Sequence, residues 1–233
     1  MNSSKRNLIL VLVIVLAGLS AAAFFYFNRA DRNLNESPFF VMLDKDIITS
    51  AESKFSLEMK ETFRQKIEEA NKEIRPDAAK DALITAYGNR ALYQTYLGEY
   101  ENAYNSYLKS LELNSQSRVQ WLALGDLLVK MKAYKTAENA YGKAKIINAY
   151  EPQVYLKLAD LYKISALDDK EKIKKLFEEG LANIADNTLL LDAYARWSAD
   201  AGDKTKAIEL YQQLIKLQPG NAEALNREID KLK

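Results

Sequence analysis

The chain has 233 residues and a formal net charge of +1, from 33 basic against 32 acidic side chains, so its charge selects neither nucleic acid nor an acidic partner. It contains no cysteine and no histidine, which excludes disulfides, thiol nucleophiles, and the commonest general base and metal ligand. No two of its eight glycines are close enough to form a phosphate-binding loop. We therefore expect no cofactor, no metal site, no catalytic residues and no enzyme; a carboxylate-dependent hydrolase survives these exclusions, but no acid pair has a recognisable partner.

Residues 1–28 contain a predicted membrane anchor. Residues 8–27 carry no charge, and at about 1.5 Å per residue a helix of this length reaches roughly 30 Å, enough to cross a hydrocarbon core. The alternative is a cleaved signal peptide with its cleavage site at Ala21–Ala23, which would make a secreted protein. We favour the retained anchor because the apolar run continues past these alanines.

The residues in and around this run also predict its orientation and its pairing. Basic residues flank it on both sides: Lys5 and Arg6, then Arg29 and Arg32. A very short basic tail usually stays in the cytoplasm, so we expect the rest of the chain outside the cytoplasm. Small residues have the spacing that pairs transmembrane helices, which would give a homo-oligomer: Ala17, Gly18, Ala21 and Ala22. The alternative is that these small residues simply fill the span.

Two segments separate the anchor from the rest. Residues 29–53 predict a linker, whose apolar run 39–43 is expected either to pack on the first helix pair or to dock on a membrane or partner. Residues 54–76 predict an amphipathic helix with Ser56 as its N-cap. Its apolar residues recur at steps of three and four: Met59, Phe63, Ile67, Ala70 and Ile74. We expect this helix to cap the following array; the alternative is that it folds into a groove as an internal ligand.

From residue 87 to residue 217 the sequence repeats itself with a period of 34. A bulky residue is followed by a small one four positions later: Tyr87 with Ala91, Trp121 with Gly125, Tyr155 with Ala159, and Leu191 with Ala195. A second pattern places an aromatic residue in the later half of each unit: Tyr107, Tyr141, Phe177 and Tyr211. A period of this length predicts two helices per repeat in a solenoid, with residues 77–220 forming four repeats.

The predicted helix pairs are 78–97 with 100–113, 117–131 with 134–148, 152–165 with 169–184, and 188–201 with 204–217. The third pair has two extra residues, which the register places in the turn 165–169. Residues 221–233 predict a capping helix with a stripe of Leu225, Ile229 and Leu232, since repeat arrays need a polar-backed end.

These motifs resemble the tetratricopeptide repeat family. The first-helix signature is matched by Trp121, Leu124, Gly125 and Leu128, and the second-helix signature by Tyr134, Ala137, Tyr141 and Ala144. The resemblance implies an all-α fold: an α-solenoid of four helix pairs, with an N-terminal transmembrane helix, an amphipathic helix and a C-terminal capping helix. One span followed by repeats is similar to the plan of bacterial envelope assembly factors, which implies a single-pass envelope protein with its repeats extracytoplasmic.

The resemblance also implies a concave groove, lined by the first helix of each pair, that binds a protein or peptide. The residues it implies are Leu92, Tyr96, Leu122, Asp126, Val129, Lys130, Leu156, Asp160, Lys163 and Arg196. Gly88 and Leu92 stand where chaperone-binding relatives grip a terminal carboxylate, so we expect instead apolar anchors and a basic residue for Asp126 and Asp160. Two alternatives are that these side chains only pack the array, and that the chain is a structural subunit of a membrane complex whose N-terminal segment fills its own groove.

Overall fold

The computed structural model describes residues 40–164 and 169–233. The chain divides into two units, residues up to Leu43 and Asp44–Lys233, and every described helix belongs to the second unit. The predicted span at residues 8–27 lies outside the described residues, so the anchor stays a prediction. Within 40–164 and 169–233, no helix is both long enough and apolar enough to cross a bilayer.

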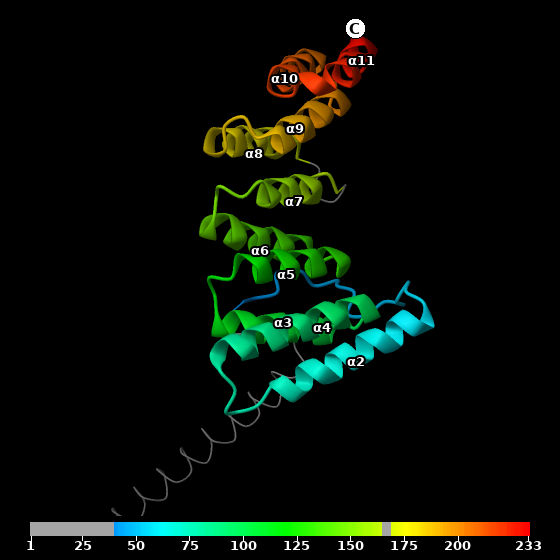
Figure 1. Cartoon of the computed structure of the whole chain (residues 1–233), viewed down its shortest axis with the longest axis vertical. Helices are drawn as coiled ribbons and strands as arrows, with labels where there is room; N and C mark the ends of the chain where they lie inside the picture. The colour runs from blue at the N-terminus through cyan, green and yellow to red at the C-terminus, as the bar shows by residue number, and fades with distance from the viewer. Residues whose placement is uncertain (1–39, 165–168) are drawn as a thin grey trace, which may run out of the picture. The chain divides into compact units, whose positions relative to one another are not determined.

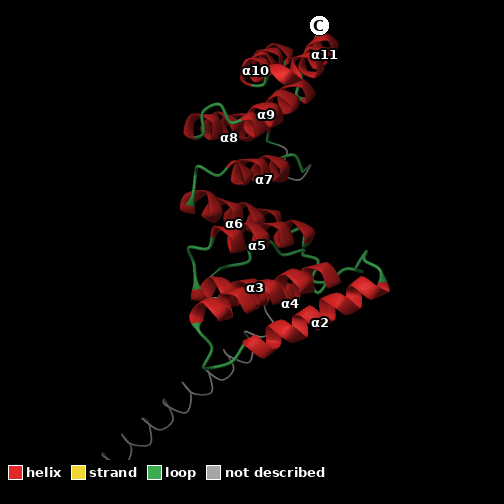
Figure 2. Ribbon diagram, in the orientation of Figure 1, coloured by secondary structure: helices red, strands yellow, loops and turns green. Residues whose placement is uncertain are grey.

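The described helices form four consecutive pairs, stacked between a leading and a closing helix (Figures 1 and 2). The pairs are α3 (Lys80–Leu97) with α4 (Tyr100–Leu113), α5 (Arg118–Lys130) with α6 (Tyr134–Ile147), α7 (Pro152–Tyr162) with α8 (Lys170–Asn183), and α9 (Thr188–Asp200) with α10 (Lys204–Leu217). The leading helix is α2 (Leu57–Glu73), and the closing elements are η1 (Pro219–Asn221) and α11 (Ala222–Leu232). The predicted all-α repeat fold is confirmed for this part of the chain.

The small-residue column is buried in every repeat. Ala91, Ala159 and Ala195 are at most 1% exposed, and Gly125 is also buried. A Cβ atom added to Gly125 would overlap the ring of Tyr141 on α6, so glycine there lets the tyrosine ring lie directly against α5. The four second-helix aromatics are all buried: Tyr107, Tyr141, Phe177 and Tyr211. Burying a large apolar side chain contributes about 1.5–3 kcal/mol to the free energy of folding, so these repeated aromatics help to stabilise the array.

Helix α2 covers the first face of the array by packing along α3. Its predicted N-cap is confirmed, because the Ser56 side chain accepts a hydrogen bond from the Met59 amide at 3.3 Å. Rings from α2, the residues before it and α3 form one cluster, with centroids 5.0–6.3 Å apart: Phe55, Phe63, Tyr93 and Tyr96. The contact with α3 agrees with the expected capping role of this helix.

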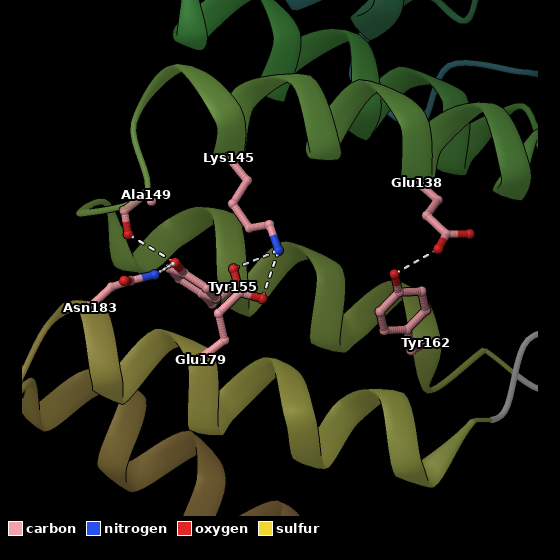
Figure 3. Close-up of polar contacts among 7 residues, drawn as sticks. All are labelled: Glu138, Lys145, Ala149, Tyr155, Tyr162, Glu179 and Asn183. Carbon is pink, nitrogen blue, oxygen red and sulfur yellow. Dashed lines mark hydrogen bonds and ion pairs between the residues drawn. The ribbon is translucent and has the colours of Figure 1, made fainter.

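Polar contacts fasten α7 between α6 and α8 (Figure 3). The Tyr155 hydroxyl donates to the Ala149 carbonyl at 2.9 Å and accepts from the Asn183 side chain at 2.7 Å. Lys145 on α6 reaches Glu179 on α8 at 2.8 Å. A further bond, from the Tyr162 hydroxyl to Glu138 at 2.7 Å, ties the end of α7 to α6. These bonds fix the position of the third repeat on the second.

Candidate functional site

A pocket of about 330 Å³ opens between α5 and α7, the first helices of the second and third repeats. Its polar lining comprises Asp126, Lys130, Tyr141, Lys157 and Asp160, and its apolar lining comprises Val129, Leu161 and Ile164. Four residues of the predicted groove therefore line one pocket: Asp126, Val129, Lys130 and Asp160.

Asp126 is the most constrained charged group of this pocket. Its carboxylate accepts a hydrogen bond from the Tyr141 hydroxyl at 2.6 Å and forms an ion pair with Lys157 at 2.8 Å. Burial, reinforced by the bond to Asp126, raises the pKa of Tyr141 far above its ordinary value, so the phenol stays a fixed donor. Asp126 thus joins α5, α6 and α7 in the lining of the pocket.

The other two charges of the pocket differ in their pairing. Asp160 forms an ion pair with Lys163 at 3.0 Å, one turn along the same helix. Lys130 is exposed, and no carboxylate among the described residues lies within ion-pair distance of it. The pocket therefore presents one unpaired cation beside an aliphatic wall.

The remaining predicted residues lie in several places. Leu92, Leu122 and Leu156 are half-buried on α3, α5 and α7, and Tyr96 belongs to the aromatic cluster at α2. Lys163 lines a small pocket beside Trp197. Arg196 is paired with Asp192 at 2.9 Å and lines a pocket of about 310 Å³ bounded by α9, α10 and α11. The ten residues do not converge on one site.

Sequence reasoning did not name Lys157 or Tyr141 as part of a binding surface. Lys157 precedes Asp160 by three positions on α7, which puts both residues on one helical face. This spacing could have indicated that Lys157 lies on the same surface as Asp160. Tyr141 was predicted only as a packing aromatic, although its partner Gly125 adjoins Asp126.

A larger pocket, of about 800 Å³, lies between α2 and α3 and was also not predicted. Its floor holds small side chains, among them Ala70 and Ala86, and its rim holds Glu69, Glu73 and Asp81. Glu69 is paired with Lys66 at 2.7 Å. In the part of the chain that the structure describes, no three acidic side chains are grouped so as to hold a metal ion.

Comparison with known proteins defines the class of this fold. The tetratricopeptide repeat profile matches residues 84–117, which span α3 and α4. The crystal structure of MamA superposes with a TM-score of 0.56 and 16% identity, over 71% of this chain and 94% of that chain. The fold is thus a tetratricopeptide-type helical array, and the chain contains a tetratricopeptide repeat.

Two further solved structures are similar at lower scores. YrrB, described as a TPR protein with an unusual peptide-binding site, gives a TM-score of 0.47 and 21% identity over 74% of this chain and 87% of that chain. PilF of Pseudomonas aeruginosa gives a TM-score of 0.44 and 18% identity over 72% of this chain and 82% of that chain. No curated protein sequence matches the chain.

Proposed function

We propose that this protein is an interaction scaffold that binds a segment of a partner protein at the pocket between α5 and α7. The observation that carries the proposal is the convergence there of Asp126, Val129, Lys130 and Asp160 with an aliphatic wall. Helical repeat arrays present extended concave surfaces for such binding. A pocket of about 330 Å³ has room for a few anchoring side chains of a partner segment.

The pairing inside the pocket favours a particular partner chemistry. Asp126 and Asp160 are paired with Lys157 and Lys163, so a basic partner residue would have to compete with internal lysines. Lys130 is the charge left available for a charge-assisted hydrogen bond. The partner segment therefore offers an acidic side chain to Lys130 and an apolar side chain to the wall of Val129, Leu161 and Ile164, in place of the basic residue that the sequence suggested.

The self-occupied groove is the less favoured alternative for the described residues. The residues that line the pocket come from α5, α6 and α7, and from Ile164 just after α7. Helix α2 packs along α3 instead. Among the described residues, the segment 44–73 lines no part of the pocket.

Site-specific photo-crosslinking in native membranes tests the proposal. A crosslinking amino acid replaces Val129, inside the pocket, or Lys143, an exposed residue of α6, in the full chain. We expect a discrete crosslinked partner from position 129 that is absent from position 143. The same products from both positions would refute a binding site at this pocket.

The tether is a second part of the proposal. Residues 8–27 supply an uncharged run long enough to span a bilayer, and the short basic tail before it favours an extracytoplasmic array. Alkaline extraction of membranes followed by protease treatment of intact cells tests this directly. We expect the protein to stay in the membrane pellet and the array to be digested from outside; a soluble chain lacking its first residues would support the secreted alternative.

A further inference from the structure

Residues 44–53 bind along one edge of the array, although the sequence predicts them as part of a linker. We call these residues the strap. The Ile48 amide donates to the Met131 carbonyl at 2.8 Å, and the Ala51 amide donates to the Gly98 carbonyl at 3.0 Å. Both carbonyls lie where the first helix of a pair turns into the second. In Figure 1 the strap is the blue trace beside α3 and α5.

The strap also caps the second helices of the first two pairs. The Asp44 carboxylate accepts hydrogen bonds from the Lys135 amide at 3.2 Å and from the amide and hydroxyl of Thr136 at 2.9 and 2.6 Å, in the first turn of α6. The Thr49 carbonyl accepts from the Glu101 amide at 3.0 Å, in the first turn of α4. A helix N-terminus has amide groups that need such acceptors.

The same position in the later repeats shows what the strap replaces. Helices α8 and α10 follow Asp169 and Asp203, whose own side chains accept from the amides of Lys172 and Lys206 at 3.0 Å. The equivalent cap residues of α4 and α6 are Glu99 and Ala133, which make no capping side-chain bond. Asp44, which lies 92 positions before Thr136 in the sequence, takes the place of a local cap on α6.

Gly98 is suited to this contact in two ways. Its φ of +82° requires the left-handed region, and a Cβ atom there would overlap the Ala51 carbonyl oxygen. Gly202 occupies the matching turn of the fourth repeat with a φ of +89°, but a Cβ atom there would meet nothing within 4 Å. The two turns therefore share one backbone conformation and differ in the presence of the strap.

We propose that the edge formed by residues 98–101 and 131–136 is a second binding site, separate from the pocket between α5 and α7, for an extended segment that begins with a carboxylate. In this protein the site is filled from within by the strap. The occupant caps α4 and α6 and joins the first repeat to the second, so the chain just before the array takes part in the array's structure.

Hydrogen exchange of the full chain with a matched glycine pair tests the site. Gly98→Ala and Gly202→Ala impose the same backbone strain, but only the first displaces the strap. We expect the Ile48 and Ala51 amides to be protected in the unmodified chain and to exchange at least about tenfold faster in Gly98→Ala only. Unprotected amides in the unmodified chain, or equal loss of protection in both variants, would overturn the proposal.

A second variant pair separates capping from docking. Asp44→Ala should speed exchange both in the strap and in the first turn of α6. Adding Ala133→Asp supplies the local cap that α8 and α10 possess, and should restore protection at Lys135 and Thr136 while the strap amides remain fast. Asp44→Ala with unchanged exchange at Ile48, Ala51 and Thr136 would show that the carboxylate holds nothing.

Discussion

The contact between Gly125 and the Tyr141 ring sets how closely α5 and α6 approach. We predict that Gly125→Leu lowers the free energy of unfolding by about 1–3 kcal/mol or more, because the added side chain has no space beside the ring. Thermal unfolding followed by circular dichroism measures the effect. Gly142→Ala is the control: it lies inside α6 with nothing within 4 Å of the added Cβ, and should stabilise by about 0.5–1 kcal/mol. Equal changes in both variants would remove the role assigned to Gly125.

Buried tyrosines make the stability of the array sensitive to high pH. Among the described residues, burial raises the pKa of six phenols above the ordinary value: Tyr104, Tyr107, Tyr141, Tyr162, Tyr194 and Tyr211. The folded state keeps these protons when the unfolded chain, whose phenols titrate near about pH 10, has released them. Their contribution is therefore fully present below about pH 10 and is lost as the pH rises further.

We accordingly predict that the unfolding temperature falls above about pH 10, and that tyrosine ionisation accompanies the loss of helix. Parallel measurement of ultraviolet absorbance and circular dichroism along an alkaline titration checks this. Ionisation of all 14 tyrosines while the helix content stays constant would contradict the burial of these phenols.

Among the elements, α7 uses Tyr155 for polar connections to the turn that precedes it and to α8 (Figure 3). Tyr155→Phe leaves the Ala149 carbonyl and the Asn183 side chain without this hydroxyl, so we predict a loss of about 1–2 kcal/mol in stability. The control is Tyr150→Phe, since Tyr150 is 74% exposed and should change stability little. Denaturant unfolding of both variants measures the difference; an unaffected Tyr155→Phe would mean that the Tyr155 hydroxyl does not stabilise the position of α7.

The sequence predicted the paired helices well because each pair repeats an apolar spacing that only stacking can bury. The boundaries of α4 and α10 come out as predicted, and those of the other helices within a few residues. The strap could not be predicted in the same way. Its bonds to Gly98 and Met131 use backbone groups, which every residue carries, and Asp44 caps a helix that begins far along the chain.

The candidate site was predicted in part for a related reason. Asp126, Lys130 and Asp160 follow from the repeat register, which places them on the same face of α5 and α7. The ion pair between Asp126 and Lys157 crosses from one repeat to the next, so it depends on how the two helices are rotated against each other. A period fixes which positions are equivalent but does not fix that rotation.

For the array as a whole, the two ends are closed by elements outside the 34-residue period. Helix α2 covers α3, and α11 packs on α10 with Ile229 buried at 5% exposure. Capping elements of this kind keep a repeat array soluble by ending its apolar stacking. The pocket between α5 and α7 lies between these two ends of the array.

The most direct test of this scaffold is the affinity of the crosslinked partner for two charge-reversal variants of the full chain. Lys130→Glu removes the unpaired cation of the pocket, whereas Lys143→Glu makes the same charge change on α6 outside the pocket. We predict that binding weakens about tenfold or more in Lys130→Glu, corresponding to about 1.4 kcal/mol, and stays unchanged in Lys143→Glu. Unchanged binding in Lys130→Glu, or an equal loss in both variants, would contradict a partner site at this pocket.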